Sequence, residues 1–173
     1  RKNALNENGV EAISKFELKN STKMKSKKSC KCNCGALCVE VTGSPVVQLV
    51  CHCNDCREAT QLPFIEAAFF KAEDCVAHGD SRSLEMKGSS GLDKAYVGCS
   101  NCGTTLYARV EALNGACVIV TNHQSTFEFE AQSHIWTSEK VDDEEIPGDA
   151  LQSESGPPDD IREHMIATFW AKG

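Results

Sequence analysis

The sequence predicts a mainly β domain followed by a C-terminal helix. Short runs rich in Val, Ile, Phe and Tyr alternate with turns that contain Gly or Pro, from residue 36 to residue 138. Such a succession of short strands is typical of β-sheets packed on one another. The last stretch, residues 161–170, instead spaces its apolar side chains at helical intervals. With 173 residues, the chain is long enough for one domain with appendages.

The strands are expected where apolar residues alternate or run together between turn residues. They lie at residues 36–41, 46–50, 64–70, 83–86, 95–97, 104–110, 117–121 and 134–138. Residues 57–61 are expected to form one helical turn, which Pro63 keeps from extending. Residues 74–80 and 88–91 contain glycine and are interpreted as loops.

The charge distribution divides the chain into three parts. Residues 1–29 are polar and end in a basic run, Lys23-Met24-Lys25-Ser26-Lys27-Lys28, so a solvated extension is expected rather than a short helix with a linker. Residues 30–140 carry the strands and the clustered cysteines, and form the predicted β domain. Residues 141–173 comprise an acidic, irregular segment and an amphipathic helix. We expect that helix to dock on its own domain, with a dimer contact as the alternative.

Cys51, Cys53 and Cys56 form the first candidate site, because three of the eleven cysteines fall within six residues. Side chains at i and i+2 of a strand share a face, so Cys51 and Cys53 point the same way. The Asn-Asp pair that follows favours a turn, which brings Cys56 back toward them. Sulfurs gathered this closely suit tetrahedral zinc. Three ligands leave one position open, which is typical of a reactive rather than a structural zinc.

The second candidate site combines two short pairs of cysteines. Cys99 and Cys102 are spaced as a turn, and the glycine after them permits the positive φ that such a turn needs. Two more ligands are available among Cys30, Cys32 and Cys34, which offer two registers. The glycine after Cys34 favours the later pair. Cys32, Cys34, Cys99 and Cys102 would then complete a closed four-thiolate site, so two zinc ions per chain are predicted.

Six motifs follow one another between residues 30 and 140. They are Cys32-x-Cys34-Gly35-Ala36, Cys51-His52-Cys53-x-x-Cys56-Arg57, Pro63-Phe64, Gly79-Asp80, Cys99-x-x-Cys102-Gly103-Thr104-x-Leu106-Tyr107 and His134-Ile135. In this order they resemble the glutathione-dependent formaldehyde-activating enzyme family, which also includes the centromere protein V group. The resemblance implies an Mss4-like arrangement of packed antiparallel sheets around the zinc sites. It also implies that the four-cysteine set holds a structural zinc and the three-cysteine set a catalytic one.

The activity implied by the resemblance is the reversible joining of formaldehyde to glutathione, which is carbon–sulfur lyase chemistry. Three thiolates donate much charge to a zinc ion, so capture or release of sulfur suits this site better than a difficult hydrolysis. We therefore expect a zinc-dependent carbon–sulfur lyase, or the reverse addition, acting on a thiol adduct of a small molecule such as a glutathione or cysteine conjugate. The alternative is a non-catalytic zinc-binding module that engages a protein or nucleic-acid partner.

Four further residues are candidates for the reactive site. His123 is a candidate general acid or base, although a histidine in a surface loop is the competing interpretation. Arg57 could clamp a substrate carboxylate, although a surface ion pair is the commoner role. Thr60 and Gln61 precede Pro63, where members of the family that the chain resembles usually carry a Ser-Gly pair, and are expected to bind substrate.

The remaining histidines and cysteines near these motifs are interpreted as structural. His52 should point away from the metal, because neighbouring residues of a strand face opposite sides, and His134 should be packed. Cys38, Cys75 and Cys117 have no partner at ligand spacing and are interpreted as ordinary thiols.

The composition limits the partners and the location that we expect. The net charge of −7 argues against nucleic acid as the principal partner. No apolar run is long enough to cross a membrane, and no signal peptide is visible. Clustered rather than dispersed cysteines point to a reducing compartment, so an intracellular, cytoplasmic location is expected.

Overall fold

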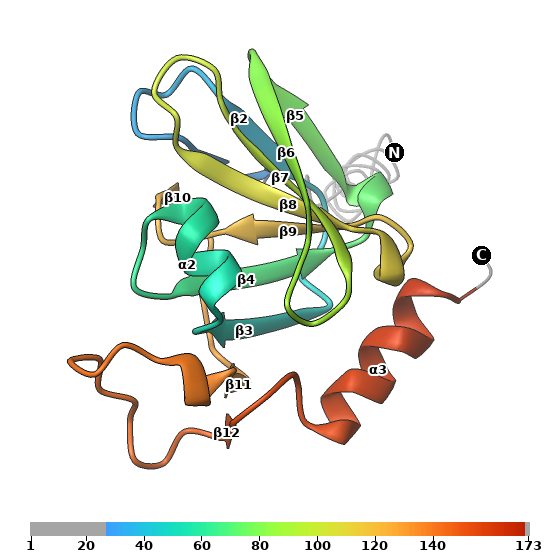
Figure 1. Ribbon diagram of the computed structural model, residues 1–173. Coiled ribbons are helices and arrows are strands. Elements are labelled where there is room, and N and C mark those ends of the chain that lie inside the picture. Colours follow the sequence, from blue (N-terminus) through green and yellow to red (C-terminus); the bar gives the residue numbers. More distant parts are fainter. Residues whose placement is uncertain (1–26, 172–173) are drawn as a thin grey trace, which may run out of the picture.

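The computed structural model describes residues 27–171, which form two β-sheets and two α-helices (Figure 1). One sheet has four strands in the order β10-β1-β2-β5, and the other has eight in the order β12-β11-β3-β4-β9-β8-β7-β6. The strands are β1 (Lys28–Lys31), β2 (Cys38–Val41), β3 (Val47–Cys51), β4 (Ile65–Phe70), β5 (Cys75–His78), β6 (Ser81–Lys87), β7 (Asp93–Cys99), β8 (Thr105–Val110), β9 (Ala116–Val120), β10 (Gln124–Ser125), β11 (Ser133–Ile135) and β12 (Gln152–Ser153). The helices are α2 (Asn54–Thr60) and α3 (Asp159–Phe169), with short 3₁₀ segments η1 (Ala72–Asp74), η2 (Glu111–Leu113) and η3 (Thr137–Glu139). The predicted mainly β class and C-terminal helix are confirmed.

The central strands of the eight-stranded sheet are buried on both faces, which explains why they are apolar at successive positions. All five residues of β9 are buried. Val118 and Val120 belong to a core shared with α3, whereas Cys117 and Ile119 belong to a core shared with β2. Successive side chains of a strand point to opposite faces, so one strand supplies both cores. Accordingly, α3 lies on the side of the large sheet away from β2 and β5 (Figure 1).

Parallel pairing at one side of the large sheet brings the chain after β11 beside the three-cysteine motif. Most strand pairs are antiparallel, but β11 runs parallel to β3, with Ile135 opposite Cys51. The short β12 in turn pairs in parallel with β11. Segments that follow residue 135 are thereby placed next to the end of β3.

The loop predicted for residues 74–80 is wrong, because Cys75–His78 forms β5, an edge strand antiparallel to β2. Most of its side chains are exposed, so no alternation of buried and exposed residues marks it in the sequence. The helical turn predicted for residues 57–61 is a longer helix, α2, that begins at Asn54. The strand predicted for residues 134–138 ends at Ile135, and 3₁₀ segment η3 follows.

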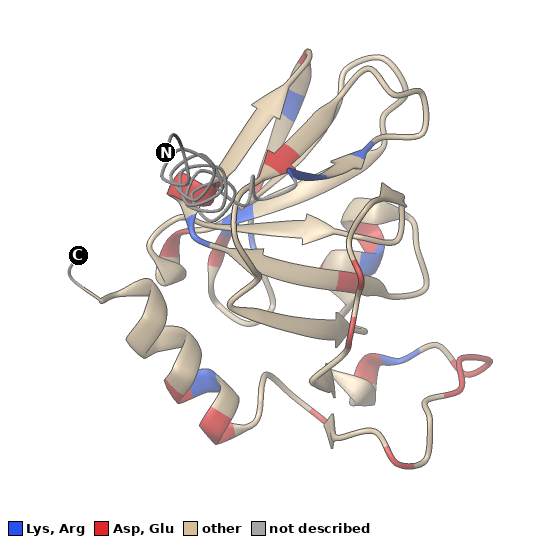
Figure 2. Cartoon of the chain, turned by 180° about the vertical axis from the view of Figure 1, so that it is seen from behind, with Lys and Arg blue, Asp and Glu red and all other residues tan. Residues whose placement is uncertain are grey.

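The predicted division at residues 29, 140 and 173 stays a prediction, although two features bear on it. Strand β1 begins at Lys28, and residues 1–26, with most of the basic run, lie outside the described residues. The acidic segment is largely irregular apart from β12, and Figure 2 shows its Asp and Glu positions in red along the chain up to α3.

Helix α3 is docked on the β domain through one face. It starts directly after Pro158, and Asp159 and Asp160 in its first turn suit the positive end of the helix dipole. Met165 and Phe169, one turn apart, are 4% exposed and belong to the core. A dimer through this helix is not shown.

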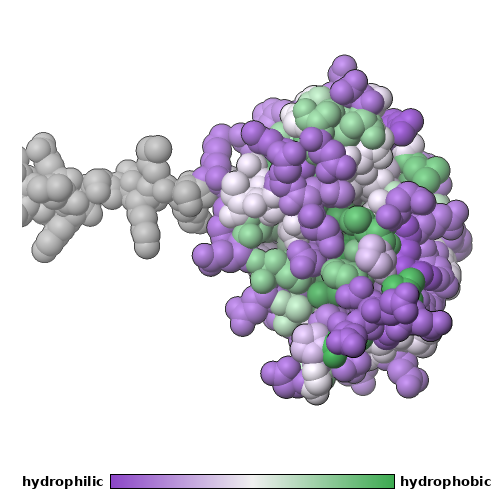
Figure 3. Space-filling model, turned by 90° about the vertical axis from the view of Figure 1, so that its left-hand side faces the viewer, coloured by the Kyte–Doolittle hydropathy of each residue, from purple (hydrophilic) through white to green (hydrophobic). Residues whose placement is uncertain are grey.

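The surface of the described part carries six exposed large hydrophobic residues, of which Ile166 and Trp170 lie one turn apart at the end of α3. They are Val76, Leu84, Leu92, Leu151, Ile166 and Trp170. On the face in Figure 3, hydrophobic areas are interrupted by hydrophilic residues. None of the described helices has the length and apolar character that a membrane crossing requires.

Candidate metal centres and the adjoining cavity

Four cysteines from two distant parts of the chain meet in one cluster. The sulfurs of Cys32, Cys34, Cys99 and Cys102 all lie within 4.8 Å of one another. Cys34 Sγ is 3.6 Å from Cys32 Sγ and 3.7 Å from Cys99 Sγ. A tetrahedron of sulfurs around zinc, with Zn–S bonds of about 2.3 Å, has edges of about 3.8 Å. The donor set and its spacing therefore fit a closed four-thiolate site.

The structure distinguishes the two registers that the sequence allowed. Cys30 is fully buried, and its Sγ lies 3.4 Å from the Val120 carbonyl oxygen, away from the cluster. Hydrogen bonds orient the sulfurs of the chosen pair: the Leu37 N–H donates to Cys32 Sγ (3.2 Å), and Asn101 Nδ2 donates to Cys34 Sγ (3.3 Å). The latter bond is the main reason why the pKa of Cys34 is lowered. Such donors stabilise the thiolate form that a metal requires.

Cys51, Cys53 and Cys56 form the second cluster, again with all sulfurs within 4.8 Å and all three residues buried. Cys51 ends β3, and Cys53 is the N-cap of α2. The Cys53 sulfur accepts a hydrogen bond from the Cys56 N–H (3.4 Å). The strand end and the first helical turn thus bring the three sulfurs together. Among the residues that the structure describes, no fourth Cys, His, Asp or Glu joins this group.

Without a metal, the second cluster concentrates negative charge on its central sulfur. The thiols of Cys51 and Cys56 donate to Cys53 and lower its pKa to about 2. The pKa of Cys51 is raised, chiefly because it shares its proton with Cys53. A divalent cation would replace the remaining thiol protons, and the all-sulfur donor set suits zinc.

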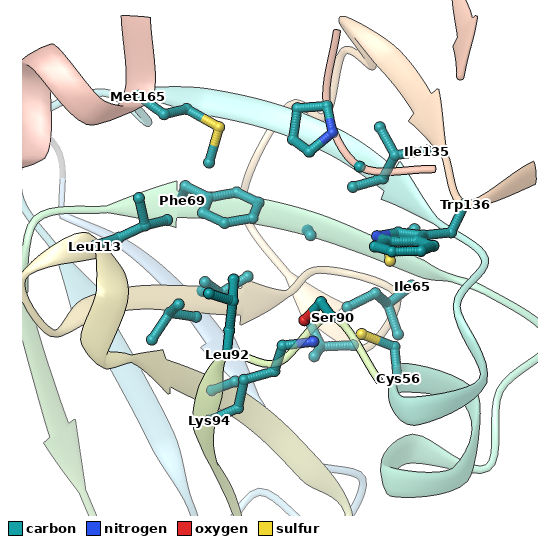
Figure 4. A pocket seen from close by; sticks show the side chains of 18 of the residues that line it. Cys56, Ile65, Phe69, Ser90, Leu92, Lys94, Leu113, Ile135, Trp136 and Met165 are labelled. Carbon is teal, nitrogen blue, oxygen red and sulfur yellow. The ribbon is translucent and has the colours of Figure 1, made fainter. Parts of the chain in front are cut away.

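A cavity of about 200 Å³ opens beside this cluster, between the large sheet and the C-terminal part of the chain. Cys51 and Cys56 form part of its wall. The other lining residues are almost all apolar: Ile65, Ala67, Phe69, Ser90, Leu92, Lys94, Tyr96, Ala108, Val110, Leu113, Val118, Val120, Ile135, Trp136, Gly156, Pro157 and Met165. Figure 4 shows Cys56 and Trp136 at one end, and Leu113 and Met165 at the other.

The few polar groups of this cavity gather near the sulfurs. The Tyr96 hydroxyl lies 3.4 Å from Cys56 Sγ and can donate to it. Burial, followed by the charge of Cys56, raises the pKa of Tyr96, so its hydroxyl stays protonated. Lys94 and Ser90 also point into the cavity (Figure 4), and the buried Ser90 Oγ has no hydrogen-bond partner among the described residues.

A small network positions the Lys94 side chain and the turn that carries Ser90. Asp55 Oδ2 accepts a hydrogen bond from the Ser89 N–H (2.9 Å) and lies 3.6 Å from Lys94 Nζ. A Cβ on Gly88 would meet this carboxylate oxygen at 2.5 Å, so a larger residue there would displace the Asp55 carboxylate. Burial lowers the pKa of Lys94, but the negative charge of the cysteine cluster, together with that of Asp55, raises it more, so the net shift is upward. A cation therefore faces the cavity at its sulfur end.

The four other candidates from the sequence do not line the cavity. His123 Nε2 lies 3.0 Å from the Thr105 carbonyl oxygen. Arg57 Nη2 hydrogen-bonds to Asn54 Oδ1, Thr60 Oγ1 donates to the Cys56 carbonyl (2.7 Å), and Gln61 Nε2 donates to the Glu58 carbonyl (2.7 Å). The last three contacts hold helix α2 together, and Gln61 ends the helix with a left-handed φ of 59°.

His52 and His134 pack against each other on the other side of β3. His52 is 1% exposed, and its Nε2 lies 3.1 Å from His134 Nδ1. Burial, followed by the neighbouring His134, lowers the pKa of His52 to about 4, and burial lowers the pKa of His134. Both are thus neutral packing groups at pH 7.

Sequence reasoning missed Lys94, Ser90 and Trp136 as parts of the site. None of them stands in a cysteine motif, and hairpin β6–β7 and parallel strand β11 bring them to the cavity from distant positions. The only relevant pattern in the sequence was the Gly-Ser-Ser-Gly turn before Lys94. It predicts the tip of a hairpin, but not that this tip lies beside the three-cysteine cluster.

Comparison with known proteins places the chain in a family. No curated protein matches the sequence. The family described as glutathione-dependent formaldehyde-activating enzyme matches residues 27–139, which is more than half of the chain and includes all seven clustered ligand candidates. On this match, the protein belongs to the glutathione-dependent formaldehyde-activating enzyme family.

Proposed function

We propose that the protein is a zinc-dependent carbon–sulfur lyase that cleaves, or forms, a thiol adduct of an aldehyde. The observation that carries this proposal is the shared location of sulfurs and polar groups: Cys51 and Cys56 form the wall of a cavity at the end that also holds Lys94 and an unpartnered Ser90 hydroxyl. A buried polar atom without a protein partner is free to bind a ligand group or a water molecule, and a ligand oxygen would satisfy Ser90. Family membership supports the thiol and aldehyde chemistry.

The reaction needs no oxidant or reductant. In the cleavage direction, the carbon–sulfur bond breaks and sulfur keeps the electron pair. The hydroxyl group on the carbon loses its proton and becomes a carbonyl group, and the thiol product takes up a proton. The site must therefore stabilise charge on a sulfur and on an oxygen attached to the same carbon.

The residues present fit the metal that this chemistry calls for. Cys51, Cys53 and Cys56 would hold zinc, because their sulfurs are gathered within 4.8 Å and one carries a negative charge at neutral pH. When bound, zinc supplies a positive charge that stabilises a thiolate. The Tyr96 hydroxyl orients Cys56.

Lys94 and Ser90 would hold the oxygen of the adduct. The ammonium group can donate to that oxygen and stabilise the negative charge that develops there, and the Ser90 hydroxyl gains the partner that it lacks. The apolar walls keep water away and strengthen both contacts. Lys94 thus replaces His123 as our candidate for the residue that stabilises charge on the adduct oxygen.

The four-cysteine cluster has a different proposed role. Cys32 and Cys34 precede β2, Cys99 ends β7 and Cys102 follows it, so one zinc there would tie the two sheets together. With four thiolates the site is closed, which suits structure rather than catalysis.

The proposal is tested by cleavage of S-hydroxymethylglutathione and the corresponding cysteine adduct, measured as release of free thiol. We expect Cys53→Ser to lose activity to the uncatalysed background while its circular dichroism is retained. Cys38→Ser, which changes a cysteine outside both clusters, is the matched control and should stay active. Wild-type activity in a folded Cys53→Ser protein would contradict the proposal.

The alternative of a non-catalytic zinc module has less support. Such a module would close its metal with a fourth protein ligand, and within residues 27–171 the three-cysteine cluster has none.

A further inference from the structure

The cavity at the three-cysteine cluster is much larger than a formaldehyde adduct needs. A hydroxymethyl group would occupy only the sulfur end of a space of about 200 Å³. An apolar cavity of about 150 Å³ stays dry in a protein and binds benzene. A void of this size destabilises a protein when it is left empty, because its walls lose packing contacts. Its volume therefore points to an occupant larger than one carbon.

The walls of the cavity exclude the charged parts of glutathione. Apart from Lys94, Tyr96 and Ser90 near the sulfurs, the lining side chains are apolar. The carboxylates and the ammonium group of a glutathione adduct would lose their hydration in such a space without gaining partners. The apolar interior therefore suits the carbon side of the adduct, and the peptide side stays at the mouth.

The two ends of the cavity differ in their side chains. Figure 4 shows the cysteine sulfurs, Trp136 and Lys94 toward one end and Phe69, Leu113 and Met165 toward the other. Along β4, residues Ile65, Ala67 and Phe69 lie on the same face and line it in succession. An elongated apolar group attached to a sulfur-bearing carbon would extend from the metal site toward α3.

Residues outside the matched part of the chain contribute to the cavity wall. Met165 of α3 lies at the far end beside Leu113 (Figure 4), the Gly156–Pro157 segment also lines the cavity, and the family match ends at residue 139. Met165 is held in place because Phe169, one turn later, is buried in the same core. The C-terminal helix therefore sets how far a ligand can reach, independently of the cysteine motifs.

We propose that this cavity binds the apolar carbon group of a thiol adduct made from an aliphatic or aromatic aldehyde, of roughly six to eight carbons by comparison with the benzene-binding cavity. This substrate class rests on the proposed lyase function. The adduct carbon lies at the sulfur end, its hydroxyl group contacts Lys94 and Ser90, and its chain extends to Met165. In cleavage, the carbon–sulfur bond breaks, the carbon-bound oxygen becomes the carbonyl of the released aldehyde, and the hydroxyl proton is returned to the thiol.

Binding is tested first, without turnover, by titrating the zinc-loaded protein with 1-hexanol and with methanol. The chain contains three methionines, and only Met165 lines this cavity among the residues described. With ¹³C-methyl labelling of methionine, we expect the Met165 signal to shift with 1-hexanol and not with methanol. The signal that disappears in Met165→Ala assigns it. No shift with 1-hexanol overturns the inference.

Two variants test the cavity itself. Ala67→Leu fills its middle and should abolish 1-hexanol binding, whereas Ile166→Ala, on the exposed side of α3, should bind like the wild type. If Ala67→Leu does not fold, Met165→Ala serves, because it lengthens the cavity and should favour 1-octanol over 1-hexanol. Since this variant lacks the Met165 signal, its binding of the two alcohols is measured by isothermal titration calorimetry beside that of the wild type. Unchanged alcohol preference in the folded variants overturns the inference.

Turnover then separates this inference from the lyase proposal. We expect kcat/KM to be at least tenfold higher for the hexanal adduct of glutathione than for the formaldehyde adduct, since methylene groups in an apolar pocket discriminate by about this factor or more. Turnover of the formaldehyde adduct without any preference for hexanal overturns the substrate class and leaves the lyase function standing. Binding of 1-hexanol with no adduct cleaved overturns the lyase function, and the substrate class with it.

Discussion

At the scale of single residues, the site separates into groups that the sequence reveals and groups that it does not. The seven clustered cysteines could be named from spacing alone, because i, i+2 and i, i+3 pairs are brought together by local backbone geometry. Lys94 and Ser90 could not, because Asp55 and the hairpin tip position them through long-range contacts. His123, chosen for its ordinary pKa range, lies against a backbone carbonyl instead.

Lys94 is the residue whose replacement should affect chemistry most without removing a metal ligand. Lys94→Gln keeps a hydrogen-bond donor but loses the charge that faces the cavity. We expect kcat/KM for adduct cleavage to fall roughly 100-fold, as for loss of one donor to a developing oxyanion. The measurement is steady-state kinetics together with zinc content, which should not change. Lys87→Gln, an exposed lysine in the same hairpin, is the control; an equal loss in both variants would contradict a specific role for Lys94.

At the scale of elements, the sequence predicts strands whose apolar and polar residues alternate and strands that are apolar throughout. It does not predict a strand that lacks such a pattern and forms only by pairing with a neighbouring strand. Strand β5 is an exposed edge strand, and only its pairing with β2 makes it a strand. Helix α2 starts three residues earlier than predicted, because the Cys53 sulfur caps it. That cap is a metal-ligand candidate, so helix start and site geometry depend on one side chain.

Cys99, at the end of β7, tests the structural role of the four-cysteine cluster. Cys99→Ser removes a ligand that joins β7 to the turn before β2. Since structural zinc binding is coupled to folding, we expect insoluble or unfolded protein. Soluble yield and circular dichroism are compared with those of Cys38→Ser, which should fold normally. A folded Cys99→Ser protein that retains two zinc ions would show that this cluster does not hold the fold together.

His134, on β11, gives the contact between β11 and β3 a pH dependence. Its pKa is lowered by burial, so the folded state keeps it neutral while the unfolded state, with a pKa near 6.5, takes up a proton. The neutral His134 side chain therefore makes its full contribution to the free energy of unfolding above pH 6.5, and this contribution is lost as the pH falls below 6.5. We expect His134→Gln to flatten the decline in the free energy of unfolding between pH 6.5 and 5, by up to about 1.4 kcal/mol per pH unit. Urea unfolding at fixed zinc measures this, and identical slopes for both proteins would refute it.

At the scale of the whole molecule, the sequence predicts the parts but not which cavity they enclose. The class, the two cysteine clusters and the C-terminal helix all follow from local patterns. The choice of sheet face for α3 depends on which of two cores its Met165 and Phe169 join, and periodicity alone does not decide between them. That choice places the helix at the end of the cavity opposite the three-cysteine site, and so determines the size of the cavity.

The whole fold should also keep its two metals with unequal strength. The four-thiolate site ties two sheets together, whereas the three-thiolate site faces a cavity and has no fourth protein ligand among the described residues. A chelator can reach the second metal without unfolding the chain.

The central claim is therefore tested most directly by zinc content, circular dichroism and adduct cleavage followed together during mild chelation. We predict that two zinc ions per chain fall to one while the circular dichroism spectrum is retained and cleavage is lost. One equivalent of added zinc should restore activity. Simultaneous loss of both metals with unfolding, or full activity with one zinc remaining, would contradict the account.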